Sequence, residues 1–256
     1  MIDIKDITVV KIGGNVVDDA AALQQFVADF AALRGPKILV HGGGKEATRL
    51  AEKMGVEVKM VDGRRITGRE MLDIAVMVYA GAVNKRVVAA LQAAGCNAIG
   101  LSGADADTVR ARRRPAEPID FGFVGDIQSV AAGRLRMLLG AGLTPVFSAI
   151  MHDGAGTLLN CNADSVASAV AVGMAGTAAV DLVYCFEKEG VLDEAGDVIS
   201  RISRTDFERL KAAGTVNSGM IPKIENALRA VAKGVRSVTI KRAAAVNDPT
   251  AGTVIK

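Results

Sequence analysis

The sequence predicts an α/β fold, a three-layer αβα sandwich with an open, mostly parallel sheet. Short β-branched runs alternate with longer amphipathic stretches along the chain, a pattern typical of parallel strands joined by crossover helices. Hydrophobic residues make up 50% of the 256 residues, whereas aromatic residues make up only 4%. A core of Ala, Val, Leu and Ile suits buried parallel strands that are covered by close-packed helices.

The individual elements follow from hydrophobic periodicity and from breaker residues. Strands are expected at residues 7–12, 37–40, 97–101, 144–148, 180–185, 237–241 and near 253. Helices are expected at residues 19–33, 46–54, 67–78, 83–94, 135–141, 163–174 and 220–234. Thr67 is expected to cap its helix, and Thr205-Asp206-Phe207-Glu208 to open another helix as a capping box. Residues 121–125, Phe-Gly-Phe-Val-Gly, predict a hairpin that projects from the body.

The chain is expected to form one domain over residues 1–256. A soft division near residues 173–177 separates an N-lobe of about residues 1–176 from a C-lobe of about residues 177–256. A sheet that continues through both lobes is favoured over two independent domains, because strands and helices alternate on both sides of the division.

Charge and cysteine content narrow the function class. The 31 basic and 28 acidic residues nearly balance, and aromatic residues are few, which argues against a nucleic-acid partner. The one basic run, Arg110 to Arg114, is interpreted as a solvated loop. Three cysteines without C-x-x-C spacing indicate a reducing, cytoplasmic compartment. We expect no membrane span and no signal peptide.

The first candidate site is Lys11-Ile12-Gly13-Gly14, at the end of the first predicted strand. A lysine in an apolar strand is costly unless it meets an anion. The two glycines let the backbone approach a phosphate closely and offer N–H donors. An ordinary turn with a lysine that reaches to solvent explains the motif equally well.

The second candidate site is His41-Gly42-Gly43-Gly44, between the second predicted strand and a helix. Glycines at a helix N-terminus form an anion site from unpaired N–H groups and the helix dipole. The spacing fits neither a P-loop nor a dinucleotide fingerprint. An esterase oxyanion hole would need a G-x-S-x-G nucleophile elbow, which is absent.

Two further motifs place charged residues at the start of helices. Asn160-Cys-Asn-Ala-Asp164 precedes an Ala- and Val-rich helix, where capping alone would explain Asp164. Gly219-Met-Ile-Pro-Lys223 puts a lysine in a first helical turn, against the dipole, so an anion is expected to compensate. All four motifs are expected where strands end, which is where open α/β sheets bind ligands.

In this order, the motifs resemble the amino-acid kinase family over almost the whole chain, and within it the members that phosphorylate an N-acylated glutamate. The resemblance rests on these motifs together with Asp62-Gly-x-Arg65-x-Thr67, residues 121–125 and Gly190-Val-Leu192. It implies the amino-acid kinase fold and an ATP-dependent transfer of the γ-phosphoryl group to a γ-carboxylate in arginine biosynthesis. N-acetyl-L-glutamate is the expected substrate, and the product is an acyl phosphate.

The resemblance also implies residue roles. The expected catalytic residues are Lys11 and Lys223, on opposite sides of the transferring group, and Asp164, which holds both lysines. The expected substrate-binding residues are Gly43, Gly44, Arg65 and Asn160, and the expected ATP-binding residues are Gly13, Gly14, Glu187 and Gly190. The C-lobe would bind ATP, and the N-lobe would bind the acyl amino acid and form a homodimer. Mg²⁺ would ride on the ATP phosphates, without a dedicated protein metal site.

The chain departs from the family at one position. A Ser/Thr-Asp pair usually follows the strand at 181–185, whereas Cys185-Phe186-Glu187 stands here, so Glu187 is expected to replace the aspartate. The arginines at 110–114 are hypothesised to lie near the acyl pocket, where they would suit N-succinyl-L-glutamate. The alternatives are that substrate, another family substrate such as carbamate or an aminoadipate derivative, and a catalytically silent sensing module. A dinucleotide-dependent oxidoreductase lacks its glycine fingerprint.

Overall fold

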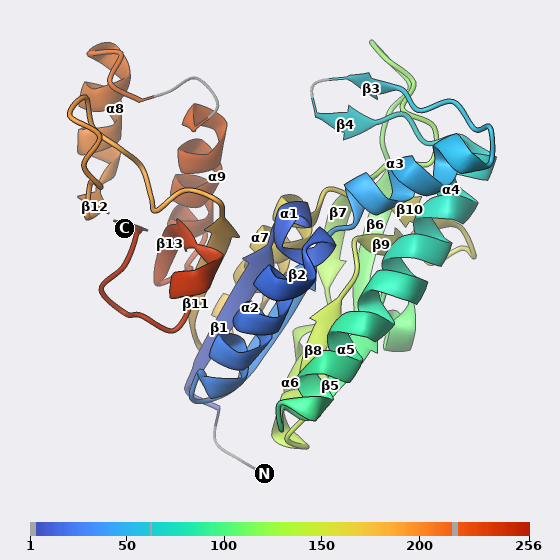
Figure 1. Cartoon of the computed structure of the whole chain (residues 1–256), viewed down its shortest axis with the longest axis horizontal. Helices are drawn as coiled ribbons and strands as arrows, with labels where there is room; N and C mark the ends of the chain where they lie inside the picture. Colours follow the sequence, from blue (N-terminus) through green and yellow to red (C-terminus); the bar gives the residue numbers. More distant parts are fainter. Residues whose placement is uncertain (1–3, 62, 217–219) are drawn as a thin grey trace.

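The computed structural model describes residues 4–61, 63–216 and 220–256. Asp62 and Gly219, which belong to two of the motifs, lie outside the described residues. Within these ranges the chain forms the expected αβα sandwich (Figure 1). An eight-stranded sheet lies between two layers of helices, and its strand order is β12-β14-β13-β11-β1-β2-β8-β5.

The central strands are β1 (Asp6–Ile12), β2 (Lys37–His41), β5 (Ala98–Leu101), β8 (Thr144–Phe147), β11 (Ala179–Phe186) and β13 (Ser237–Arg242). These six strands pair in parallel. Beyond β13, β14 (Thr253–Ile255) pairs with it in antiparallel direction, and the edge strand β12 (Arg201–Ile202) pairs in parallel with β14. Because β1 pairs with both β2 and β11, the two halves of the chain share one sheet.

Helices cover both faces of the sheet. One layer contains α1 (Gly14–Asp18), α2 (Ala20–Ala32), α3 (Gly44–Lys53), α4 (Arg69–Ala75), the π-helical η1 (Val76–Val83) and α5 (Asn84–Ala93). The other contains α6 (Ala132–Gly140), α7 (Ala163–Ala175), α8 (Arg204–Ala212) and α9 (Ile221–Ala232). Short 3₁₀ turns lie at η2 (Asp105–Asp107) and η3 (Ala243–Ala245).

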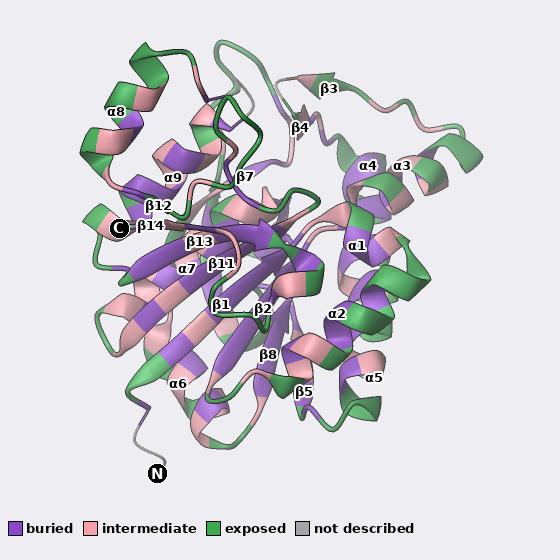
Figure 2. Cartoon of the chain, turned by 60° about the vertical axis from the view of Figure 1, so that its left-hand side comes forward, coloured by how far each residue is buried: buried purple, intermediate pink, exposed green. Residues whose placement is uncertain are grey.

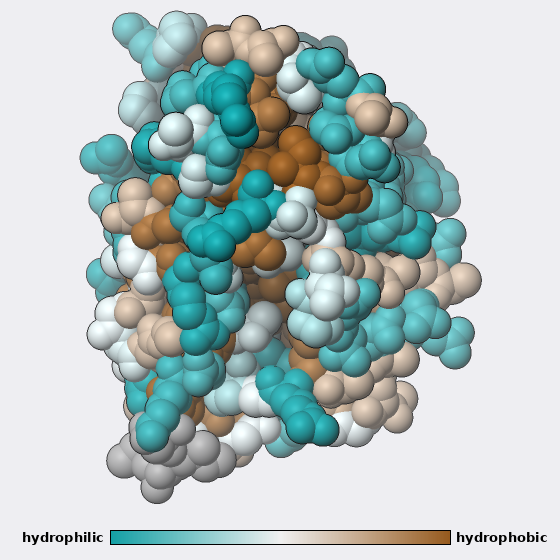
Figure 3. Space-filling view, turned by 90° about the vertical axis from the view of Figure 1, so that its left-hand side faces the viewer, coloured by the Kyte–Doolittle hydropathy of each residue, from teal (hydrophilic) through white to brown (hydrophobic). Residues whose placement is uncertain are grey.

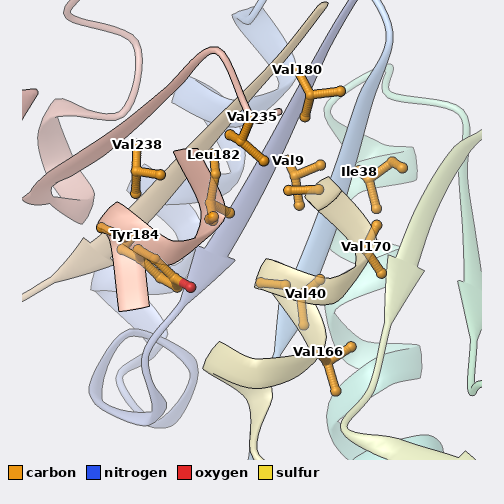
Figure 4. Packing of buried hydrophobic residues seen from close by; sticks show 14 of the residues in the cluster. Val9, Ile38, Val40, Val166, Val170, Val180, Leu182, Tyr184, Val235 and Val238 are labelled. Atoms are coloured by element: carbon orange, nitrogen blue, oxygen red, sulfur yellow. The ribbon is translucent and has the colours of Figure 1, made fainter. Parts of the chain in front are cut away.

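Each face of the sheet has its own apolar core, because successive side chains of a strand point to opposite faces. Val9 packs in the core beneath α7 and α9, whereas Val10 packs in the core beneath α2 and α5. Figure 4 shows the first core, where Val166 and Val170 of α7 pack towards side chains of β1, β2 and β11. The buried strands form the centre of the molecule in Figure 2, and exposed residues gather on the outer helices and loops.

A smaller sheet supports one end of the large one. Its strand order is β10 (Leu158–Asn160), β9 (Ile150–His152), β6 (Val109–Arg113) and β7 (Gly125–Val130). A separate two-stranded ribbon, β3 (Met60–Val61) and β4 (Arg64–Arg65), stands above α3 and α4 (Figure 1). The sequence did not indicate β3, β4, β9, β10 or β12, because runs of two or three residues are too short to show a period.

Two predicted caps are wrong. Gly68, not Thr67, caps α4, and the Thr67 hydroxyl instead donates to the Arg65 carbonyl at 3.0 Å. The capping box of α8 is formed by Ser203 and Asp206, two residues before the predicted one. Ser203 satisfies the same spacing rule, and its side chain accepts from the Asp206 N–H.

The projecting hairpin is also wrong. Residues 121–125 lead into β7, and the strands that pair as a hairpin are β6 and β7. Phe121 and Val124 are buried, and hydrogen bonds join this segment to Thr67 and Asn160. The segment therefore packs against the body of the protein and does not project from it.

The helices predicted at 67–78 and 83–94 join through η1 into one run, Arg69–Ala93. This run is long and apolar enough to pass a length-and-composition test for a membrane span, although 44% of its most apolar window is buried in the protein. Ile74, Val78 and Val87 pack in the core, as expected for the core helix of a globular domain.

Candidate active site

A cavity of about 590 Å³ opens where β1, β2 and β11 end at their carboxyl edges. The position follows from the topology, because parallel strands bring the loops after them to the same edge. Lys11, Gly13 and Gly14 line it from β1, Gly42 to Lys45 from the loop after β2, and Phe186 to Lys188 from β11. Lys223, in the first turn of α9, closes it from the opposite side.

Lys11 and Asp164 form an ion pair inside this region. The Lys11 Nζ lies 2.8 Å from the Asp164 Oδ1, and only 10% of the lysine side chain is exposed. Asp164 stands in the first turn of α7, where the helix dipole also favours a carboxylate. Asn162 caps the helix by accepting from the Ser165 N–H. Capping and charge pairing are therefore divided between two residues of the motif.

Lys223 approaches the same carboxylate from α9. Its Nζ lies 3.7 Å from the centre of the Phe186 ring, and the Lys11 Nζ lies 5.2 Å from that centre. Burial lowers the pKa of Lys223 below its ordinary value, and the charges of Lys11 and Lys188 lower it further. Asp164 and Glu187 oppose this decrease in the pKa. Two lysines thus face one cavity, with fewer carboxylates than ammonium groups around them.

The residues Gly42 to Gly44 after β2 are called the glycine loop. A second, smaller cavity of about 190 Å³ lies on the other side of this loop. It shares Gly42, Gly43, Gly44 and Ala163 with the larger cavity. Its remaining lining comes mainly from the β3–β4 ribbon, from η1 and from the segment after β10; it includes Arg64, Arg65, Tyr79 and Asn160. The glycine loop is therefore the partition at which ligands in the two cavities would meet.

Hydrogen bonds within the protein hold the Arg65 side chain in place. Its Nη2 donates to the Gly44 carbonyl at 2.9 Å and to the Thr48 hydroxyl at 2.8 Å, and only 8% of the residue is exposed. Asn160 is anchored in a similar way, because its Nδ2 donates to the Thr67 hydroxyl at 3.0 Å. A guanidinium and an amide held in a small cavity suit an acceptor with a carboxylate and an amide group.

The glycine loop packs too tightly for side chains at one position. A Cβ on Gly43 would lie 2.7 Å from the Tyr79 Cδ1, whereas a Cβ on Gly42 would meet its nearest atom, the Ala163 Cβ, at 3.9 Å. Gly43 also precedes α3, whose first N–H groups are free to meet an anion.

Most of the predicted site residues meet in these cavities. Lys11, Gly13, Gly14, Glu187 and Lys223 line the larger one, Arg65 and Asn160 the smaller one, and Gly43 and Gly44 both. Asp164 joins them through its ion pair. The fourth motif does not follow a strand, since Ile221, Pro222 and Lys223 open α9 and the element before it is α8, but α9 brings Lys223 to the strand ends.

Gly190 lies elsewhere. It does not line the cavity, and a Cβ there would meet the Thr253 Oγ1 and the Val198 Cγ1 at 2.8 Å. The neighbouring Val191 N–H donates to the same threonine hydroxyl at 2.8 Å. In this structure the glycine permits close packing against β14.

The arginine run at 110–114 does not line the smaller cavity. Arg110 pairs with Asp107 at 2.7 Å, Arg114 pairs with Asp126 at 2.7 Å, and Arg113 stacks on the Phe123 ring. The predicted loop is wrong, because residues 110–113 belong to β6, and these contacts do not support the hypothesis of an acyl-binding role.

Sequence reasoning missed several residues of the site. Arg64 and Tyr79 line the smaller cavity, and Asn15 and Lys45, which contact each other through their side chains, line the larger one. Asn15 and Lys45 directly follow the glycines of the first two motifs, and no role was predicted for either. Tyr79 lies in the middle of a helical pattern and gave no local signal.

Metal-binding residues are sparse around the site. Within the described ranges, no group of three His, Cys, Asp or Glu side chains is arranged to hold a metal ion. Glu187 is the one carboxylate among the described residues that line the larger cavity, and Asp164 lies beside it. This donor set suits a magnesium ion that keeps most of its ligands from phosphates and water.

The chain is similar to known proteins over nearly its whole length. Residues 6–242 match the model of the amino acid kinase family. The acetylglutamate kinase of Phocaeicola vulgatus is 49% identical over 253 residues, which cover 98% of each chain. That of Cytophaga hutchinsonii is 52% identical over 239 residues, which cover 92% of this chain and 90% of the relative. The crystal structure of smu.665 from Streptococcus mutans superposes with a TM-score of 0.78 at 29% identity, covering 98% of each chain.

Proposed function

The chain belongs to the amino acid kinase family, and on that premise we propose that it transfers the γ-phosphoryl group of ATP to the γ-carboxylate of N-acetyl-L-glutamate. The enzyme is a phosphotransferase with a carboxyl-group acceptor, as the names of its full-length relatives indicate. Its product is an acyl phosphate in arginine biosynthesis.

One observation carries the proposal. Two cavities meet at Gly42 to Gly44, with the lysines on the larger side and Arg65 and Asn160 on the smaller side. A polyphosphate in the larger cavity and an acyl amino acid in the smaller one would therefore face each other across backbone N–H groups. Such positioning is most of what phosphoryl transfer requires from a protein.

The chemistry needs no general base, because the nucleophile is already a carboxylate at neutral pH. A carboxylate oxygen forms the new bond to the γ-phosphorus. The bond from that phosphorus to the β,γ-bridging oxygen breaks, and ADP leaves with the electron pair. The protein must lower the repulsion between two anions, which preorganised N–H donors and ammonium groups can do.

We assign the charge-neutralising role to Lys11 and Lys223. Asp164 would hold Lys11 through the 2.8 Å ion pair and would keep Lys223 protonated, since its charge raises the pKa of that lysine. Gly13 and Gly14 would present N–H groups to the ATP phosphates, and Gly43 and Gly44 to the reacting groups. Arg65 would bind the α-carboxylate, and Asn160 the amide of the acyl group.

ATP would enter the C-lobe side of the larger cavity with Mg²⁺ on its phosphates. The ion would neutralise charge on the β- and γ-phosphates. Glu187 is placed to hold water of its ligand sphere, since it lines the same cavity as Lys11 and Lys223. The acyl amino acid would bind in the N-lobe, as the position of the smaller cavity supports.

The proposal is tested by coupled ADP release with MgATP, in which N-acetylglutamate, N-succinylglutamate and free glutamate are offered separately and hydroxylamine traps the acyl phosphate. Trapped product with N-acetylglutamate is expected. Lys11→Ala should bind ATP and lose turnover, and full turnover in that variant would remove the lysine from the mechanism. ADP release with none of the three would point to carbamate or an aminoadipate derivative. No release with any acceptor would favour a sensing module.

One observation favours N-succinylglutamate as the second candidate. Arg64 lines the smaller cavity, and no ion pair within the described part of the chain engages it. Its guanidinium could meet a second carboxylate, a role first hypothesised for the run at 110–114. Arg64→Gln should then lower turnover of the succinyl substrate more than that of the acetyl substrate.

We also propose a cytoplasmic homodimer. In the helical run Arg69–Ala93, less than half of the most apolar 18-residue stretch is buried within one chain, and Met77 is 49% exposed. A groove of about 1140 Å³ follows this helix; α2, α3, η1 and α5 line it with apolar side chains and with charged ones such as Glu46, Arg49 and Arg86. A second copy would cover that surface. Light scattering should give twice the chain mass, and Met77→Glu should reduce it.

Three free, buried cysteines suit a reducing compartment.

A further inference from the structure

His41 is a fully buried histidine at the root of the glycine loop. It is the last residue of β2 and is 0% exposed. Its Nδ1 lies 2.7 Å from the Gly42 carbonyl, and its Nε2 lies 3.0 Å from the Asn84 Nδ2. Asn84, the first residue of α5, is 1% exposed and also contacts the Val146 carbonyl of β8 through Nδ2 at 2.9 Å.

These contacts determine which ring nitrogen carries the proton. The Val146 carbonyl can only accept, so the Asn84 atom facing it must be the amide nitrogen. That nitrogen can only donate, so the His41 Nε2 accepts. Burial lowers the pKa of His41 to about 4, and the ring is neutral at pH 7. The single ring proton therefore resides on Nδ1 and is donated to the Gly42 carbonyl.

The orientation of one peptide group follows. The Gly42 carbonyl and the Gly43 N–H belong to the same peptide, which is trans. In a trans peptide these two groups point in opposite directions. A carbonyl held towards the buried His41 ring turns the Gly43 N–H away from the core, where Gly43 lines both cavities. No backbone hydrogen bond in the described part of the chain uses this N–H.

We propose that His41 and Asn84 are positioning residues of the phosphoryl-transfer loop: Asn84 selects the Nδ1–H tautomer, and His41 holds the Gly43 N–H towards the reacting groups. The inference rests on the proposed function for the identity of those groups. The alternative is that the pair only fills a polar gap between β2, β8 and α5. That alternative predicts effects on stability alone.

The first experiment reads the tautomer without turnover. The chain has only two histidines, His41 and His152, so a long-range ¹H–¹⁵N correlation spectrum of the whole ¹⁵N-labelled protein at pH 7 gives two separable patterns. The His41 pattern should be that of the Nδ1–H tautomer. Asn84→Ala should move it towards Nε2–H and should shift the Gly43 amide resonance. A wild-type Nε2–H tautomer, or a Gly43 resonance unchanged in Asn84→Ala, would overturn the inference whatever the enzyme phosphorylates.

The second experiment separates the two ring nitrogens. His41→Asn places an amide donor near the position of Nδ1, whereas His41→Gln places its amide near that of Nε2. The kcat of His41→Asn should exceed that of His41→Gln about 10-fold, with similar Tm values for the two variants, because only the first can still hold the Gly42 carbonyl. Equal kcat values, or a higher kcat for His41→Gln, would show that the link to Asn84 is structural.

Thr144→Val is the matched control. Thr144 is buried in the same strand as Val146 and accepts from the Cys96 thiol at 3.5 Å. The substitution removes a buried polar contact without touching the glycine loop. It should leave the His41 tautomer, the Gly43 resonance and kcat unchanged, and a change in any of these would mean that they follow general destabilisation of β8. If the wild type phosphorylates no acceptor, the proposed function fails, while the tautomer and the Gly43 resonance still decide the positioning role.

Discussion

The glycine loop is expected to tolerate alanine at position 42 but not at position 43. In Gly43→Ala, the new Cβ would lie 2.7 Å from the Tyr79 Cδ1, 3.2 Å from the Cε1 and 3.5 Å from the Val83 Cγ2. Ordinary contacts begin at 3.4 Å, so the ring must withdraw by about 0.7 Å or the loop must rise. Tyr79 is 6% exposed and packs in the core beneath the loop, which leaves little room for withdrawal.

The cost can be estimated from overpacking in other cores. Forcing a methyl group against a buried ring costs about 1–3 kcal/mol. For a chain of this length, each kcal/mol lowers Tm by about 2–4 °C, so the decrease should be roughly 2–12 °C. Tyr79 also lines the smaller cavity beside Arg65. A displaced ring or loop should therefore raise the KM for the acyl amino acid as well.

Thermal and denaturant unfolding of three variants tests this reasoning. Gly42→Ala and Gly44→Ala meet their nearest atoms at 3.9 Å, and their unfolding free energies should stay within about 0.5 kcal/mol of the wild type. Because Gly43 is also the N-cap of α3, a Gly43→Ala/Tyr79→Leu double variant is needed to separate the clash from the cap. A stability of Gly43→Ala equal to that of Gly42→Ala, or additive effects in the double variant, would refute the clash.

Three further predictions concern the charges of the site. Asp164→Asn should lower kcat about 100-fold, because it leaves the buried Lys11 unpaired. It should also move the alkaline limb of the pH–kcat profile to lower pH. Asp164 raises the pKa of Lys223, and the protonated lysine is the active form. Phe186→Leu should move the same limb in the same direction with little change in Tm, because it removes the ring 3.7 Å from the Lys223 Nζ; an unshifted limb would contradict the contact. Arg65→Lys should raise the KM for N-acetylglutamate about 10-fold and leave the KM for ATP unchanged, because an ammonium that replaces Nη2 at Gly44 and Thr48 leaves no second nitrogen for the carboxylate; equal increases in both KM values would argue against its role in the acceptor cavity.

The large sheet could be predicted because its strands are buried on both faces. Runs such as residues 7–12 and 180–185 are almost wholly apolar, and each lies between helical patterns. The helix predicted at 19–33 agrees with α2 within one residue at each end, and Asp19 caps its start by accepting from the Ala22 N–H. By contrast, η1 joins two predicted helices through a segment in which apolar residues occur on every side. Hydrophobic periodicity therefore showed neither where the first helix ends nor that the two helices are continuous.

The site could be predicted where local chemistry was unusual. Lys11 in an apolar strand and three consecutive glycines before a helix are each costly without a ligand, and both motifs reached the cavity. Tyr79 and Asn84 could not be found in this way, because each is an ordinary helical residue until tertiary structure brings it to the loop. For Gly190 the ATP-binding role stays a prediction, since its close packing against β14 would by itself require a glycine.

The excess of positive charge around the larger cavity suits an anionic ligand better than a neutral one. Lys11, Lys188 and Lys223 stand against the two carboxylates Asp164 and Glu187, and the influence of the first two on the pKa of Lys223 shows that these charges interact. On the face shown in Figure 3, hydrophilic residues predominate, and hydrophobic residues lie in patches between them. A bound polyphosphate would offset the excess of positive charge and raise the pKa of Lys223, so it would favour the protonated lysine in the same direction as Asp164 does. Affinity for MgATP should then fall with ionic strength, and Lys188→Gln should weaken that dependence while leaving the KM for the acyl amino acid unchanged.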